Sequence, residues 1–117
     1  MDSAASRSFV EPDPTQTAAQ NACRAAYNCD TGTFWHGTHV AGIIAAVDNA
    51  TGVVGIAPEA TIVGVKALHA GSGSFGAIIQ ALLYASTDGR ADIINMSLGA
   101  EFNRNEDGAA ELVSALN

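Results

Sequence analysis

His36 is the residue whose type and setting favour acid–base chemistry, and it opens the run HGTHVAG that ends at Gly42. We expect His36 to lie just ahead of a helix, where aligned backbone dipoles place partial positive charge and favour the neutral imidazole. A neutral imidazole can accept a proton, as a general base must. Gly37 lets a substrate approach the ring, and Thr38 is predicted to cap the helix that holds it. A histidine in this position can also be a helix cap or a surface residue. The other motifs of the chain are therefore needed to choose between these roles and catalysis.

A second histidine, His39, follows three residues after His36 and raises the question of a metal site. The zinc-protease signature needs two histidines four residues apart with a glutamate between them. Neither condition holds here, so we do not expect these two side chains to bind a metal.

Helical and strand-like segments alternate along the chain. From Thr38 to Val47 the sequence is apolar on enough sides to form a buried helix. Two short apolar runs rich in branched residues, Thr61–Leu68 and Ala91–Leu98, are typical of strands covered on both faces. Between them, Ser74 is predicted to cap a helix that ends near Gly89.

The order of these segments indicates the fold class. A strand, a helix and a second strand of this length imply a right-handed parallel crossover. With a last, weak helix over Glu106–Leu116, we predict an α/β fold, a partial doubly wound parallel sheet with helices on both faces. Ligands of such sheets bind beyond the carboxyl ends of the strands, where the run from Ser97 to Gly99 falls. Residues 1–33 lack apolar periodicity and are expected to form a loop or mobile N-terminal segment ahead of a domain over 34–117.

The composition of the chain argues against several classes of function. The 117 residues carry a formal net charge of −7 and only five scattered basic side chains, so no nucleic-acid-binding surface is predicted. No stretch reaches the roughly 18 apolar residues of a membrane span, and no signal peptide is visible. Cys23 and Cys29 form either a small disulfide-closed loop or two free thiols, and their spacing does not match a Cys-x-x-Cys motif.

Four motifs together give the chain a resemblance to the subtilisin-like serine proteases. HGTHVAG at His36–Gly42 is similar to the histidine motif of that family, and GVVGIAP at Gly52–Pro58 to the segment that follows it. The run Ile62–Leu68 resembles the family's strand with its lysine, and DIINMSLG at Asp92–Gly99 its substrate-binding strand. The motifs stand in the family's order between about residues 33 and 117, which makes a chance similarity very improbable.

The resemblance implies a serine endopeptidase with an Asp/His/Ser triad, which acts on polypeptides and needs no cofactor for its chemistry. His36 would be the general base toward a serine and then the general acid toward the leaving amine. Two backbone edges would pair with an extended substrate peptide, one on each side of it. Their residues are Ser97, Leu98 and Gly99 on one side and Gly71, Ser72 and Gly73 on the other.

The resemblance also implies a structural calcium site, which occurs in part of the family. The matching ligand positions in this chain are Val47, Asn49, Thr51 and Val53. Calcium takes six or more oxygen ligands, and no upstream segment here matches the remaining ones, so a plain helix-terminating turn stays the alternative. Phe75 likewise has two interpretations, as the wall of a side-chain pocket or as part of the core.

Two members of the triad depart from the family's pattern. Asp30-Thr31-Gly32 spells the aspartate turn, but Asp30 lies six residues before His36 and no apolar strand precedes it. We therefore expect the catalytic aspartate upstream of Met1, with Asp30 as the alternative. No serine stands in a Gly-Thr-Ser-Met-Ala-like run and no oxyanion asparagine is recognisable, so we expect both beyond Asn117.

Two interpretations of different classes remain open. The first is an interior fragment of a secreted subtilisin-like endopeptidase. The second is a non-catalytic remnant, a natural truncation that keeps a peptide-binding edge as a binding or scaffold domain. Under either, the 117-residue chain alone is expected to be inactive because it lacks the nucleophile. Secretion follows from the resemblance and agrees with the two cysteines, whereas cleavage preference and oligomeric state are not indicated.

Overall fold

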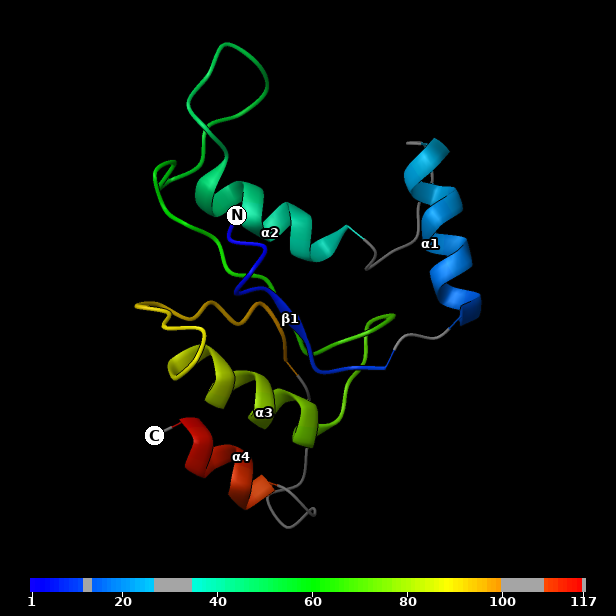
Figure 1. Ribbon diagram of the computed structural model, residues 1–117, viewed down its shortest axis with the longest axis vertical. Helices are drawn as coiled ribbons and strands as arrows, with labels where there is room; N and C mark the ends of the chain where they lie inside the picture. The colour runs from blue at the N-terminus through cyan, green and yellow to red at the C-terminus, as the bar shows by residue number, and fades with distance from the viewer. Residues whose placement is uncertain (12–13, 27–34, 100–108, 117) are drawn as a thin grey trace. The chain divides into compact units, whose positions relative to one another are not determined.

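Two short strands and four helices make up the described part of the chain, residues 1–11, 14–26, 35–99 and 109–116 of a computed structural model (Figure 1). Their order is β1 (Arg7–Ser8), α1 (Pro14–Ala26), α2 (His36–Ala45), β2 (Val65–Lys66), α3 (Phe75–Ser86) and α4 (Ala109–Leu116). The chain divides into two compact units. The α2 unit consists of Met1 with Pro12–Ile62, and the α3 unit of Asp2–Glu11 with Val63–Asn117.

The sheet belongs to the α3 unit and consists of two parallel strands. The register places Arg7 opposite Val65 and Ser8 opposite Lys66. The backbone N–H of Arg7 donates to the carbonyl oxygen of Gly64 (2.9 Å), and the N–H of Gly64 donates to Ser6 Oγ (3.0 Å). An α/β arrangement with a parallel sheet is therefore confirmed, but the described residues form two strands and not a doubly wound sheet.

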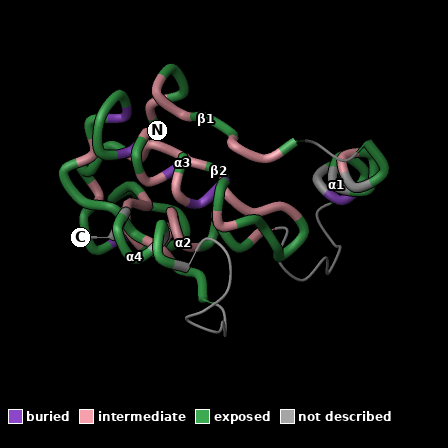
Figure 2. Tube along the Cα trace, turned by 90° about the horizontal axis from the view of Figure 1, so that it is seen from below, coloured by how far each residue is buried: buried purple, intermediate pink, exposed green. Residues whose placement is uncertain are grey.

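Helix α3 forms where its sequence pattern predicts it. Ser74 is the N-cap, and its Oγ accepts a hydrogen bond from the N–H of Ala77 (3.2 Å). One stripe of the helix is buried, and α3 packs against β2 and α4 (Figure 2). The buried residues are Ala77, Ile78, Ala81 and Ala85. At the other end Gly89 donates its N–H to the carbonyl oxygen of Tyr84 (2.7 Å), close to the predicted end of the helix.

The N-terminal segment is tied to α3 by side chains. Tyr84 Oη donates to the carbonyl oxygen of Ala5 (2.8 Å). The guanidinium of Arg7 stands over the rings of both Phe9 and Tyr84, 5.3 Å from each centroid, and the two rings are 5.5 Å apart. Cation–π and aromatic contacts of this kind hold β1 against the helix.

The expectation of a loop over residues 1–33 is wrong for the part that the structure describes, because β1 and α1 lie there. Proline suits the first position of a helix, and α1 has Pro14 at its start and several alanines, the residue with the highest helix propensity. Cys23 of α1 is buried and disulfide-bonded. The other cysteine of the chain, Cys29, lies outside the described residues. None of the described helices has the length and apolar character needed to cross a membrane.

The two predicted strands also need correction. Thr61–Leu68 contributes only Val65–Lys66 to the sheet, and Ala91–Leu98 is not a strand at all. A strand exists only where a neighbouring strand completes its hydrogen-bond ladder, and β1 offers just two paired residues. Ile93 is 88% exposed, so this apolar run lacks the cover that its sequence predicts.

Candidate active site

His36 is the first residue of α2, and its side chain is exposed. The N-cap is Trp35, whose carbonyl oxygen accepts the first helical hydrogen bond from the N–H of His39 (2.8 Å). No side chain caps this helix, so the predicted capping role of Thr38 is wrong. The helix begins two residues earlier than expected, so Thr38 lies inside its first turn. An N-cap residue precedes the first turn, so Thr38 is not in a capping position. His36 therefore stands at the end of the helix where backbone N–H groups concentrate positive charge.

The carboxyl end of α2 is held by a returning segment of the same unit. The backbone N–H groups of Gly55–Ala57 donate to the carbonyl oxygens of Ala46, Ile43 and Ile44 (2.9, 3.1 and 2.7 Å). These bonds satisfy carbonyls that a helix end otherwise leaves unpaired. A Cβ on Gly55 would lie 2.5 Å from the nitrogen of Ala46, so only glycine allows this approach.

Helix α2 is more exposed than its sequence predicts. None of its residues is buried, and Ile43 is 56% exposed. The expectation of a buried helix is thus not met within the described residues of its unit, where the segment after the helix covers only part of its apolar surface. The remaining apolar face includes a groove of about 430 Å³ lined in part by Ile43, Val53 and Ile56.

The predicted substrate edge at residues 71–73 begins in a tight turn. Ala70 and Gly71 both have positive φ, 50° and 83°, as the two central residues of a type I′ turn do. His69 and Ser72 close it with two backbone hydrogen bonds, from His69 N–H to Ser72 O (2.8 Å) and from Ser72 N–H to His69 O (3.1 Å). Both main-chain groups of Ser72 therefore form hydrogen bonds inside the turn, and its carbonyl oxygen keeps a second lone pair.

Gly73 lies close under the end of β2. A Cβ at this position would collide with the carbonyl oxygen of Ala67 and lie 2.7 Å from Leu68 Cδ2. The next residue, Ser74, caps α3. The edge segment is thus held at both ends, by the strand before it and by the helix after it.

Replacing Ala70 with asparagine is expected to stabilise the protein. Alanine pays for left-handed backbone geometry, whereas asparagine adopts it readily, so Ala70→Asn should raise the free energy of unfolding by about 0.5–1 kcal/mol. Urea unfolding of the complete gene product measures this. Ala70→Val is the opposing variant, since a β-branched residue is least tolerated there, and an equal effect of the two substitutions would contradict the turn geometry.

The second predicted substrate edge, Ser97 to Gly99, is exposed and outside any strand. Ser97 Oγ accepts a hydrogen bond from Asn95 Nδ2 (2.9 Å). An amide does not take up a proton, so this contact cannot activate the hydroxyl as a nucleophile. Leu98 is 41% exposed. Both predicted edges belong to the α3 unit, and His36 belongs to the α2 unit.

The predicted calcium loop, Val47 to Val53, forms a turn. Asn49 Oδ1 accepts a hydrogen bond from the N–H of Thr51 (2.8 Å), as in an Asx turn. Four ligand positions fall short of the six or more oxygens that calcium takes, and the described residues contain no cluster of three acidic, histidine or cysteine side chains. The loop by itself therefore offers only part of the ligand set that a calcium ion needs.

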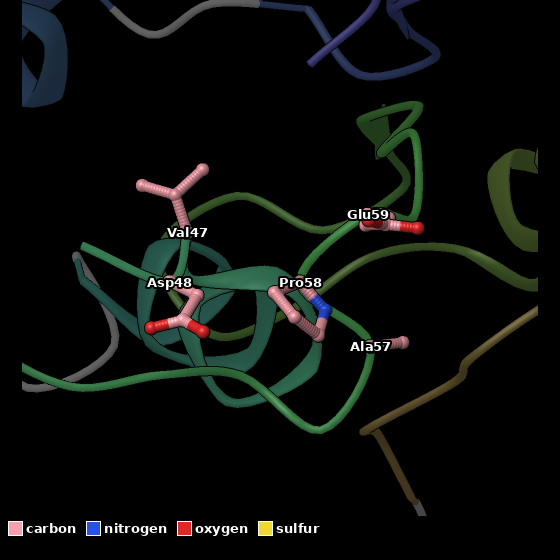
Figure 3. A pocket seen from close by; sticks show the side chains of 5 residues that line it. All are labelled: Val47, Asp48, Ala57, Pro58 and Glu59. Carbon is pink, nitrogen blue, oxygen red and sulfur yellow. The ribbon is translucent and has the colours of Figure 1, made fainter.

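An open pocket of about 600 Å³ begins at the same loop. It is lined by Val47, Asp48, Ala57, Pro58 and Glu59 (Figure 3). Sequence reasoning did not identify its two carboxylates, which lie apart in the chain and match no spacing motif. Asp30, the alternative triad acid, lies outside the described residues.

The sequence model of the subtilase family matches residues 10–117 of the chain, which include His36 and both predicted substrate edges. The chain belongs to the subtilase family. The resemblance seen in the four motifs is thereby confirmed. Subtilases among the curated proteins align with parts of the chain at about half identity. Subtilisin DY of Bacillus licheniformis is 51% identical over 65 residues, which are 55% of this chain and 23% of that protein.

Two further relatives are also matched over only part of their length. The intracellular serine protease of Paenibacillus polymyxa is 55% identical over 65 residues, or 55% of this chain and 20% of that protein. Alkaline elastase YaB of Bacillus sp. (strain YaB) is 47% identical over 83 residues, or 70% of this chain and 20% of that protein. The chain thus spans less than a quarter of the length of each of these relatives.

Proposed function

We propose that the chain is part of a subtilisin-like serine endopeptidase in which His36 is the general base. The observation that carries this proposal is the position of His36, an exposed imidazole at the first residue of α2, within the range matched by the subtilase family. The relatives named above as a subtilisin and as a serine protease support the same reaction class. We also propose that the peptidase domain begins near residue 34, after an N-terminal segment over residues 1–33.

Each half of the proposed reaction proceeds through two proton transfers at His36. The neutral imidazole takes the proton of a serine hydroxyl as its oxygen attacks the peptide carbonyl carbon. It then gives that proton to the leaving amine as the carbon–nitrogen bond breaks, and a water molecule is activated in the same way to release the acyl group. The helix supports this role, because its far end is held by Gly55–Ala57 and its first turn carries the histidine.

The serine and the aspartate of the triad are proposed to come from sequence outside residues 1–117, with Asp30 as the alternative acid. No step of the reaction uses a metal or another cofactor. A structural calcium at Val47–Val53 would need at least two more oxygen ligands than the loop supplies.

The substrate is proposed to be an extended polypeptide that pairs with backbone groups at two edges. On the first edge we assign this pairing to Gly71, Ser72 and Gly73, with Ser72 taking part through its carbonyl oxygen because its N–H is bonded within the turn. The second edge is the run from Ser97 to Gly99. Secretion is proposed from the resemblance to the family, which includes a relative named as a subtilisin, although one relative is named as intracellular.

Labelling with a fluorophosphonate tests the reaction class. The complete gene product should react at one serine outside residues 1–117 and hydrolyse a casein substrate, whereas the isolated 117-residue chain should stay unlabelled. Peptide mass mapping identifies the labelled residue. A folded complete product that neither reacts nor cleaves casein would instead support the non-catalytic peptide-binding remnant, and a label on Ser72, Ser74 or Ser97 would contradict the assignment of the nucleophile.

A further inference from the structure

Lys66 and His69 connect β2 to the turn that carries the first substrate edge. Lys66 is the last residue of β2, and its Nζ lies 3.1 Å from His69 Nδ1. An ammonium group can only donate, so Nδ1 accepts and the imidazole is neutral with its proton on Nε2. Nε2 is buried and has no partner among the described residues. The position of the two side chains therefore defines one protonation state of the ring.

The turn between these side chains and the substrate edge contains one unfavourable backbone conformation. Ala70 holds a left-handed conformation that is unfavourable for alanine, and two backbone hydrogen bonds close the turn. The hydrogen bond from Lys66 to His69 is the side-chain contact that the structure shows between the base of the turn and the strand before it. Losing it would free the first residue of the turn.

The charged surroundings of His69 are simple. The elements packed against β2 are β1 and α3. The ionisable side chains on these two elements are Arg7 and Tyr84, and they contact each other. Lys66 is thus the charged group that contacts the imidazole, and no carboxylate of the described residues forms an ion pair with the ring.

We propose that the Lys66–His69 hydrogen bond positions the Gly71–Gly73 substrate edge and releases it on acidification. A proton added to the ring binds to Nδ1. Nδ1 can then no longer accept the hydrogen bond, and the ring carries a positive charge beside the ammonium of Lys66. Histidine is the side chain whose unperturbed charge change lies between about pH 5 and pH 8, and the test below spans that interval. The inference rests on the proposed function, since the edge is defined by substrate binding, and His69 acts as a positioning residue.

Peptide binding to the complete gene product tests this, with His36→Ala in every variant so that the general base neither titrates nor turns over the peptide. The dissociation constant of an unlabelled peptide substrate, measured by calorimetry, should rise about threefold to tenfold between about pH 8 and pH 5. His69→Asn keeps an acceptor oxygen that does not titrate, so it should bind equally at both pH values. Lys66→Met keeps the apolar stem and should bind weakly at both.

Two results would overturn the inference. The first is a dissociation constant that changes equally with pH in the protein that keeps His69 and in the His69→Asn variant. The second is peptide binding by Lys66→Met at high pH that is as tight as in the protein that keeps Lys66. Imidazole nitrogen chemical shifts of His69 give a readout that does not depend on peptide binding. They should show the Nε2–H tautomer at high pH in the parent protein, and the Nδ1–H tautomer would contradict the proposal. If the expected tautomer is present but the peptide does not bind at any pH, the proposed function is contradicted. Residues 71–73 would then not be a substrate edge that the hydrogen bond could position.

Discussion

His36→Ala in the complete gene product is expected to lower kcat for peptide hydrolysis by about 10⁴-fold or more. Without the imidazole no side chain takes the proton from the attacking serine, and none returns it to the leaving amine. KM should change little, because His36 is proposed to act on the reacting atoms and not on substrate pairing. Steady-state kinetics with a chromogenic peptide measure both constants.

His39→Ala is the matched control for that experiment. His39 lies on the same helix, is exposed like His36, and contributes its backbone N–H to the first helical hydrogen bond, which alanine retains. Its kcat should stay within about threefold of the parent value, as expected for a surface substitution. A variant lacking His36 that keeps most of its activity, or an equal loss on removing His39, would contradict the assignment of the base.

Gly55→Ala is expected to cause the largest loss of stability among the substitutions considered. The added Cβ would meet three backbone atoms of α2, at 2.5 to 2.6 Å, and backbone cannot move aside as a flexible side chain can. The three hydrogen bonds from Gly55–Ala57 to the end of α2 would be strained or broken. We expect the free energy of unfolding to fall by about 2–4 kcal/mol, measured by denaturant unfolding of the complete gene product.

Gly76→Ala provides the control for Gly55→Ala. Gly76 lies in the first turn of α3, and a Cβ there would make only an ordinary contact, 3.8 Å from Ser74 Oγ. Alanine has the higher helix propensity, so stability should be unchanged or rise by up to about 1 kcal/mol. Similar losses at Gly55 and Gly76 would show that the close approach of residues 55–57 to α2 does not carry the effect.

Sequence signals that act over one or two turns predicted the structure well. Ser74 and the apolar spacing after it predicted α3, because an N-cap and a helical stripe are both local properties. The presence of a helix after His36 was also predicted, although its start was placed two residues late. Thr38 was expected to cap it, and the structure instead has Trp35 as the N-cap, with no side-chain hydrogen bond.

Features that depend on distant partners were predicted less well. β1 exists because Arg7 and Ser8 meet Val65 and Lys66, and nothing within residues 1–11 signals that pairing. The apolar run from Ala91 to Leu98 has the composition of a strand but lacks a ladder partner among the described residues. The apolar composition of a segment indicates that its side chains favour burial. A strand forms only when another segment supplies its hydrogen-bond partners.

The sequence by itself determined the family and indicated the chemistry proposed for His36, since the motif around His36 and the three that follow it are contiguous runs whose residue types are readable in order. The tertiary structure decided which groups remain open to a substrate. The turn at Ala70 and Gly71 occupies the backbone N–H of Ser72, which a list of residues cannot show. It also revealed that Gly55 is required for contact with the end of α2. Hydrogen bonds and close approach depend on the position of the backbone in space, which residue order alone does not specify.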